Sequence, residues 1–190
     1  MAGRSIHRGD GGETRLGSGQ RVRKDDPRLE CLGGVDELSS VLGLARAALQ
    51  AHAGVEAAAG MDATLLRVQR ELHRLGAEVS RRDGSGKTGA HVGITADHVA
   101  TLARDLADLD ARLPRLHGFV LPGGGAAAAQ LHVARAVCRR VERQAVHLAA
   151  AEPLGAQVVP YLNRLSLVLF SLARWAAVSL GPGDELAEDR

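Results

Sequence analysis

One predicted helix of this 190-residue chain carries a row of side chains that could hold a polyphosphate. The row recurs at steps of three, four and three residues, which places its members on one helix face: His132, Arg135, Arg139 and Glu142. Each member directly follows an apolar seam residue, so the row lies at the edge of the core. One interpretation is a set of helix-face ion pairs, each stabilising by about 0.3–0.5 kcal/mol. The other is a comb of guanidinium groups for phosphate oxygens, because arginine offers fixed, bidentate donors.

The helix alone does not decide between these interpretations, but a glycine-rich segment near the N-terminus favours the second. Gly9–Thr14 has the sequence GDGGET, and Arg21 and Lys24 follow it. Glycines let backbone N–H groups crowd around an anion, and a threonine hydroxyl and a lysine ammonium can complete such a cradle. Asp10 could help to hold a metal ion bound to the phosphates. The alternative for this segment, taken alone, is a disordered glycine-rich terminus.

Three further segments place polar or aromatic residues at predicted helix ends. Gly34–Leu38 opens the first helix with acids, including Asp36, which suit the helix dipole. Phe119–Gly124 is a Pro/Gly loop that leads into the arginine helix. Tyr161–Ser166 opens the last helix and carries Asn163, although an asparagine beside a seam is more often a satisfied core group than a ligand contact.

A fourth segment, Gly84–Thr88, imitates a phosphate-binding P-loop with the sequence GSGKT. The motif needs a glycine five positions before Gly86, where this chain has Arg81. It also needs a preceding strand, whereas a helix is expected here. A loop between two helices is the better interpretation.

The composition excludes several classes of protein. The chain is 45% hydrophobic and 2% aromatic, which predicts a folded core built from Leu, Val and Ala. A net charge of +2 is too close to balance to indicate a nucleic-acid partner. No signal peptide and no uninterrupted run of about 18 apolar residues is present, so no membrane partner is expected. Cys31 and Cys138 lack zinc spacing and are expected to be reduced thiols, which favours the cytoplasm.

Five amphipathic stretches predict an all-α fold, a five-helix bundle in a single domain over residues 1–190. The first stretch begins at Val35, the second near Ala63 and the third after Thr95, a plausible N-cap. Pro114 ends the third stretch, and Pro160 suits the start of the fifth. The expected division is an N-terminal loop at 1–33, the bundle at 34–180 and a mobile polar tail at 181–190.

The order of these segments resembles the PduO-type ATP:cob(I)alamin adenosyltransferases. The resemblance covers nearly the whole chain, residues 9–177, and it is specific because seven individually weak segments occur in one order. In chain order they are GDGGET, RVRKDDPR, GGVDELSSVLGLARA, VQRELHRLGAEVS, FVLPGG, LHVARAVCRRVER and YLNRLSLVLFSLAR.

The resemblance implies a homotrimer of five-helix bundles with active sites between subunits. Such enzymes transfer the 5′-deoxyadenosyl group of ATP to the cobalt of cob(I)alamin and leave tripolyphosphate. Co(I) is a strong nucleophile, but it is hard to make from Co(II) in water. The family removes the lower axial ligand, because the four-coordinate corrinoid is easier to reduce, and a hydrophobic side chain fills the vacated face. Catalysis is then mostly positioning and charge stabilisation.

The resemblance also implies roles for particular residues. The residues implied to contact ATP are an N-terminal phosphate loop (Gly9, Asp10, Gly12 and Thr14), a lysine (Lys24) and an asparagine (Asn163). The catalytic set is Arg135, Arg139, Glu142 and Asp36. Within it, Arg139 contacts phosphate and Arg135 pairs with Asp36 across the subunit interface. Phe119 helps to displace the lower axial ligand. Mg²⁺ bridges phosphate oxygens without a dedicated protein cage.

Two departures from the family pattern motivate a second hypothesis. Ile6-His7-Arg8 is one residue shorter than the usual run and lacks its threonine, so a hydroxyl contact to phosphate is missing or replaced by His7. Leu167 stands where the family has a carboxylate near the corrinoid or the interface. The alternative is therefore a non-catalytic corrinoid- or nucleotide-binding carrier or sensor on the same fold. The favoured hypothesis is an active enzyme that hands its product to a cobalamin-dependent enzyme.

Overall fold

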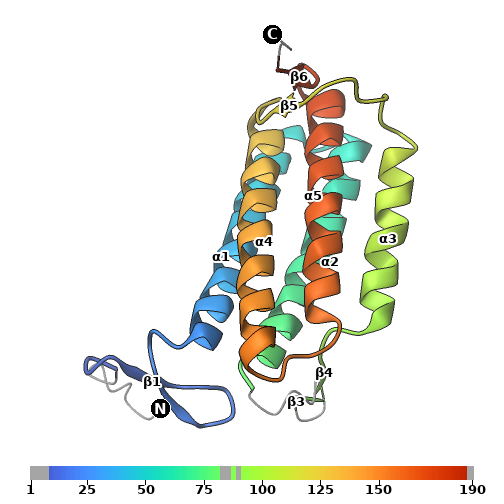
Figure 1. Ribbon diagram of the computed structural model, residues 1–190. Coiled ribbons are helices and arrows are strands. Elements are labelled where there is room, and N and C mark those ends of the chain that lie inside the picture. Colours follow the sequence, from blue (N-terminus) through green and yellow to red (C-terminus); the bar gives the residue numbers. More distant parts are fainter. Residues whose placement is uncertain (1–8, 82–86, 89–90, 188–190) are drawn as a thin grey trace.

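Five long α-helices pack lengthwise in the computed structural model, which describes residues 9–81, 87–88 and 91–187, with only the backbone at 87, 88, 91 and 92 (Figure 1). They are α1 (Pro27–Leu49), α2 (Glu56–Val79), α3 (Ala96–Asp110), α4 (Ala126–Ala151) and α5 (Val158–Leu180), and a 3₁₀ turn, η1 (Gln50–His52), follows α1. α4 packs against both α1 and α5, α2 packs on α1, and α3 packs on α5. The predicted all-α five-helix bundle is confirmed.

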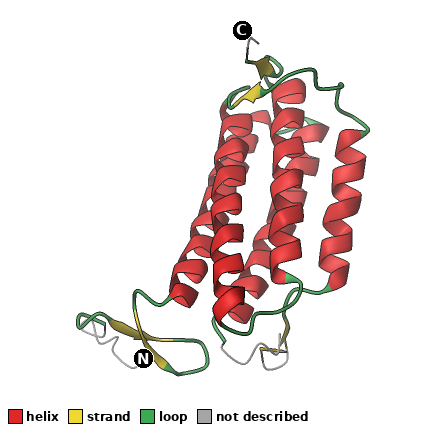
Figure 2. Ribbon diagram, in the orientation of Figure 1, coloured by secondary structure: helices red, strands yellow, loops and turns green. Residues whose placement is uncertain are grey.

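Three antiparallel pairs of very short strands lie at the two ends of the bundle (Figure 2). The pairs are β1 (Glu13–Arg15) with β2 (Arg21–Arg23), β3 (Lys87–Thr88) with β4 (His91–Val92), and β5 (Val120–Leu121) with β6 (Glu185–Leu186). None was predicted from the sequence, because a strand of two or three residues is too short to show an alternating pattern.

The core consists of aliphatic side chains, as the composition predicts. Each of the five helices contributes at least one fully buried leucine, among them Leu38, Leu65, Leu102, Leu131 and Leu165. Burying one such side chain stabilises the fold by about 1.5–3 kcal/mol. The two cysteines are free and buried, and no helix in the described part of the chain combines the length and apolar character needed to cross a membrane.

The first helix begins at Pro27 rather than at the predicted Val35. The expected boundary between a loop at 1–33 and a bundle at 34–180 is therefore wrong. Asp26 caps this helix, because its carboxylate accepts a hydrogen bond of 2.9 Å from a backbone N–H in the first turn. The proline that follows suits a first turn, whose N–H groups have no helical partner.

Glycines explain this error. Gly33 and Gly34 resembled a break, yet both lie inside α1. Gly34 lets α4 approach closely, because a Cβ at this position would lie 2.5 Å from Oε1 of Gln144. The second helix also starts earlier than predicted, at Glu56 instead of near Ala63, because its alanine-rich first turn carries few large seam residues.

The chain end, predicted to be a mobile tail at 181–190, is ordered through residue 187. Its strand β6 pairs with β5, and the Nε of Arg174 in α5 donates to Oδ2 of Asp184 at 2.8 Å. The prediction failed because β5 lies far from this segment in the sequence, so its pairing with β6 leaves no local signal. The last three residues, 188–190, lie outside the described residues.

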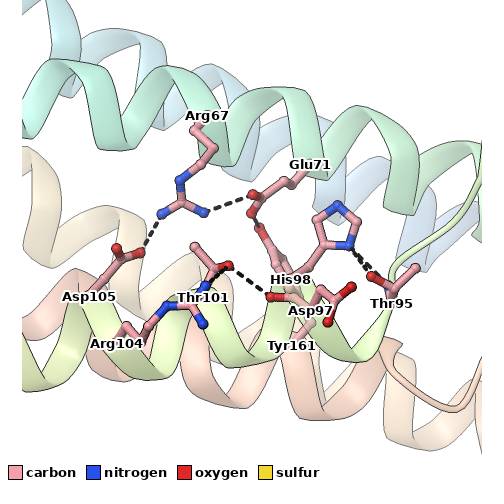
Figure 3. Close-up of polar contacts among 9 residues, drawn as sticks. All are labelled: Arg67, Glu71, Thr95, Asp97, His98, Thr101, Arg104, Asp105 and Tyr161. Carbon is pink, nitrogen blue, oxygen red and sulfur yellow. Dashed lines mark hydrogen bonds and ion pairs between the residues drawn. The ribbon is translucent and has the colours of Figure 1, made fainter.

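The third helix begins where it was predicted, after the N-cap residue Thr95, but it ends earlier than predicted. The backbone N–H of Thr95 donates to Nδ1 of His98 at 3.0 Å, which caps the helix start (Figure 3). The helix ends at Asp110, before Pro114. The segment Gly84–Thr88, which imitates a P-loop, follows helix α2 and not a strand, as expected for a loop between helices. Residues 82–86 lie outside the described residues.

A chain of polar side chains joins α2, α3 and α5 inside the bundle (Figure 3). The hydroxyl of Tyr161, which is fully buried, donates to Oε2 of Glu71 at 2.7 Å. Arg67 donates to the other oxygen of Glu71 at 2.8 Å and also pairs with Asp105. Burial, followed by the nearby charge of Glu71, raises the pKa of Tyr161 well above its usual value, so the hydroxyl keeps its proton.

We expect Tyr161→Phe to lower the free energy of unfolding by about 1–2 kcal/mol, because a buried carboxylate loses one of its donors. Urea unfolding followed by circular dichroism measures this change. Thr101→Val is the matched control, because it removes a hydroxyl that donates to a backbone carbonyl at an exposed position. This control is expected to change the free energy by less than about 0.5 kcal/mol. Equal effects of both variants would contradict the interpretation.

Candidate functional site

The glycine-rich N-terminal segment forms a hairpin with a defined turn. The backbone N–H of Gly12 donates to the carbonyl of Gly9 at 3.1 Å, and that of Lys24 donates to the carbonyl of Gly12 at 2.8 Å. Gly9 and Gly12 have φ angles of 99° and 78°, which L side chains rarely adopt. Residues 9–24 are therefore an ordered element and not the structureless terminus that was the alternative.

A hollow of about 620 Å³ opens on this hairpin, a volume within the usual range for small-molecule sites. Its lining consists of Gly9, Gly11, Glu13, Thr14, Arg15, Arg21 and Lys24. The Nζ of Lys24 lies 3.3 Å from the position that a Cβ of Gly9 would occupy, so the ammonium sits over the turn. Arg21 pairs with Glu13 at 2.5 Å, whereas Lys24 has no acidic partner within the described chain. The hollow is cationic and glycine-lined, as an anion site requires.

The predicted row on α4 faces α5 along the edge of the core. Toward one end, Nδ2 of Asn163 in α5 donates to Oε1 of Glu142 at 2.9 Å. Toward the other end, the guanidinium of Arg135 lies 5.8 Å from the ring centre of Phe170 in α5, within the range of a cation–π contact. The imidazole of His132 meets the same ring edge-on, with 6.2 Å between centres.

Arg139 lies exposed between these two contacts. Its side chain makes no ion pair or hydrogen bond within the part of the chain that the structure describes. Its neighbours differ, because Arg140 pairs with Glu37 of α1 and Arg143 donates to the Arg139 carbonyl at 3.1 Å. An ion pair between helices therefore accounts for Arg140, whereas no ion pair in the described chain accounts for Arg139. This difference favours the phosphate interpretation of the row.

The positive charge of the row resides on its arginines. His132 is 4% exposed, and burial, followed by the nearby charge of Arg135, lowers its pKa. The imidazole is therefore neutral at neutral pH. Its Nδ1 has no hydrogen-bond partner in the described chain, which suits the unprotonated nitrogen of a neutral ring.

Two predicted site residues lie apart from both groups. Phe119 precedes β5 at the upper end of the bundle in Figure 1 and is 81% exposed. Its carbonyl accepts a hydrogen bond of 2.8 Å from the N–H of Ala187, which connects the loop to the chain end. Asp36 lies exposed beside a groove of about 310 Å³ between α1 and α2, and no ion pair joins it to Arg135 within the described chain.

A family model described as cobalamin adenosyltransferase matches residues 5–176, which include the hairpin and most of the bundle. The chain belongs to this family. A cobalamin adenosyltransferase of Cupriavidus metallidurans is 45% identical over 166 residues, which cover 87% of this chain and 83% of that protein. A corrinoid adenosyltransferase of Bacillus subtilis is 38% identical over 180 residues, 93% of this chain and 87% of that protein.

Solved structures of the family agree with the fold. A variant of the PduO-type ATP:corrinoid adenosyltransferase from Lactobacillus reuteri, solved with cobalamin and ATP, is 29% identical to this chain. The two structures superimpose with a TM-score of 0.84 over 97% of this chain and 98% of the other. The predicted PduO-type family is confirmed.

The structure also contains a contact that was not predicted from the sequence. Phe170 touches both Arg135 and His132, and its position two helical turns after Asn163 on α5 is the signal that could have found it. Leu167 lies between Asn163 and Phe170 along α5 and is partly exposed. The other departure from the family pattern, Ile6-His7-Arg8, lies outside the described residues and stays a prediction.

Proposed function

We propose that this chain transfers the 5′-deoxyadenosyl group of ATP to the cobalt of cob(I)alamin and releases tripolyphosphate. The cationic, glycine-lined hollow of the N-terminal hairpin carries the proposal, because its lining combines glycines with Lys24, which has no acidic partner within the described chain. Membership of the cobalamin adenosyltransferase family over residues 5–176 supports the same activity.

The reaction is a displacement at one carbon atom. A lone pair of Co(I) attacks C5′ of ATP and forms the Co–C bond, while the C5′–O5′ bond breaks and its electron pair leaves with tripolyphosphate. The negative charge that develops on the leaving oxygen needs fixed cations and N–H donors. Lys24 and Arg139, both without acidic partners in the described chain, are proposed to supply the cationic part.

Asn163 and Glu142 are proposed to form one unit that orients ATP. Because Nδ2 of Asn163 donates to Glu142, the amide is fixed with Oδ1 available as an acceptor. The remaining predicted contacts surround the phosphates in the hairpin: Gly9, Asp10, Gly12 and Thr14. Positioning of this kind can supply much of the rate enhancement when C5′ and cobalt are held in line.

Phe119 is proposed to act on the corrinoid. Its ring is almost entirely exposed, although an apolar side chain of this size is normally buried. A flat, apolar corrinoid face would cover the ring and leave no room for a lower axial ligand on the cobalt. Four-coordinate Co(II) is then easier to reduce to the nucleophilic Co(I).

Mg²⁺ is expected to accompany ATP by bridging phosphate oxygens. The described residues contain no group of three His, Cys, Asp or Glu that could hold a metal ion. Glu13, a carboxylate that lines the hollow, is already paired with Arg21. Phosphate oxygens would therefore supply most ligands, with Asp10 as the predicted protein contribution.

A homotrimer with sites between subunits is the proposed assembly. The hairpin makes no hydrogen bond or ion pair with the α4–α5 row within the described chain. In Figure 1 the hairpin lies below the N-terminal end of α1. Each chain thus presents two incomplete halves of an ATP site. We propose that Asp36 of one chain pairs with Arg135 of the next and brings these halves together.

The buried, free thiols favour a reducing cytoplasm. A cobalamin-dependent enzyme would take the product there.

The second candidate function is a non-catalytic corrinoid or nucleotide carrier. Leu167 favours it, because an apolar side chain stands on the α5 face between Asn163 and Phe170 where the family pattern has a carboxylate. A carrier would bind ATP or corrinoid saturably but leave the triphosphate attached to adenosine.

One assay separates the two functions. The chain is incubated with ATP, Mg²⁺ and chemically reduced cobalamin, and the absorbance spectrum is followed. We expect complete conversion to adenosylcobalamin, with one tripolyphosphate released for each cobalamin converted. Saturable ATP binding without tripolyphosphate release would instead identify the carrier.

A further inference from the structure

A fully buried arginine lies just after the N-terminal hairpin (residues 9–24), where α1 begins. Arg28 is 0% exposed and occupies the first turn of α1. Its Nη1 donates to the carbonyls of Val79 and Arg81 at 2.8 and 2.5 Å. Its Nε and Nη2 both donate to Oε2 of Glu152, at 3.1 and 2.8 Å, and Nη2 also donates to the carbonyl of Pro153 at 3.1 Å. All the N–H donors of the guanidinium are thus used.

The acceptors belong to two other helix ends. Val79 is the last residue of α2, and Glu152 directly follows α4. The last carbonyls of a helix have no partner within it, and a cation suits the negative end of the helix dipole. One side chain of α1 therefore fixes the ends of α2 and α4 relative to the start of α1.

Hydrogen bonds connect the hairpin to the first turn of α1. The N–H of Asp26 donates to the carbonyl of Arg23 at 3.2 Å, and the Asp26 carboxylate caps α1. Little freedom therefore remains between Lys24 and Arg28. The hairpin also touches the same end of α2, because a Cβ at Gly17 would lie 2.5 Å from the Oγ of Ser80.

We infer that Arg28 is a positioning residue for ATP, which sets the place of the hairpin and of Lys24 relative to the bundle. The inference rests on the proposed function, because it assumes that the hairpin holds the phosphates. Arg28 acts through backbone geometry, since a wholly buried side chain cannot touch a ligand. A shorter cation with fewer donors leaves several helix-end carbonyls unpaired, and the hairpin then samples positions away from the bound triphosphate.

The test compares Arg28→Lys with wild type and with Arg46→Lys. Arg46 is the matched control, because it also links α1 to α2, through Asp62 at 2.7 Å and Gln69 at 3.0 Å, but near the opposite end of α1. We expect Arg28→Lys to raise the KM for ATP and the Kd for ATP in calorimetry about tenfold, with the KM for cobalamin unchanged. Arg46→Lys is expected to leave the KM for ATP within about twofold of wild type.

A merely structural role predicts a different result. It would raise both KM values together, or it would give the same KM for ATP in both lysine variants, and either result overturns the inference. If Arg28→Lys does not fold, Glu152→Gln decides, because it weakens the same cluster and keeps Arg28. Glu152→Gln is then expected to raise the Kd for ATP about threefold, and an unchanged Kd rejects the inference.

Calorimetry separates this inference from the proposed function. Wild type that binds ATP without adenosyl transfer would contradict the function, while the Kd ratios would still decide the role of Arg28. Wild type that transfers the adenosyl group, with equal Kd values in all variants, would contradict only the inference. Wild type that fails to bind ATP would reject both.

Discussion

Arg139→Ala is expected to lower the rate of adenosyl transfer on the order of 100-fold, because one fixed cation is lost where negative charge develops on the leaving group. Arg139 is suited to this role, since it is exposed on the row and has no ion-pair partner in the described chain. The stability of the bundle should change little, because an exposed helical arginine contributes little packing. Initial rates of adenosylcobalamin formation at saturating ATP measure the loss.

Arg143→Ala is the matched control for this loss. Arg143 lies one helical turn further along α4, is also exposed and donates only to a backbone carbonyl within the described chain. It should retain at least about half of the wild-type rate. Arg135→Ala should instead weaken assembly, because its guanidinium is proposed to face Asp36 of a neighbouring chain. If Arg139→Ala and Arg143→Ala lose activity equally, the assignment of phosphate contact to Arg139 is wrong.

The bundle was predictable because each helix carries a long, regular seam. Such seams fix which face is buried, so the fold class and the start of the third helix after Thr95 agree with expectation. Helix ends were less predictable where glycines have a packing role. The Gly33-Gly34 pair lies inside α1 because α4 approaches there, and this is a tertiary contact without a local sequence signal.

The candidate site was predictable as residue types but not as geometry. The spacing of Arg135, Arg139 and Glu142 placed them on one face, and the contact of Glu142 with Asn163 agrees with that placement. The separation of this row from the N-terminal hairpin could not be predicted, because it depends on where the start of α1 lies in the folded bundle. The burial of Arg28 was likewise hidden, since in a stretch rich in charged residues it resembles a surface residue.

Because the hairpin and the α4–α5 row are separate within one chain, the proposed assembly can be tested through its effect on activity. Lys24 belongs to the hairpin and Arg139 to the α4–α5 row, and no hydrogen bond or ion pair joins these two halves within the described chain. In a homotrimer with sites between subunits, each site combines the hairpin of one chain with the row of another. A defect in one half can then be complemented by a second chain that carries its defect in the other half.

We therefore expect two inactive variants, Lys24→Ala and Arg139→Ala, to regain activity when they are co-expressed in equal amounts with different affinity tags. Each half of a site is intact in half of the chains, so about one quarter of the sites should be complete, and the rate should approach that fraction of wild type. The matched control pairs Lys24→Ala with the double variant, and this mixture should stay inactive because none of its chains carries an intact hairpin. Purified mixed oligomers without recovered activity would show that hairpin and row serve ATP within a single chain.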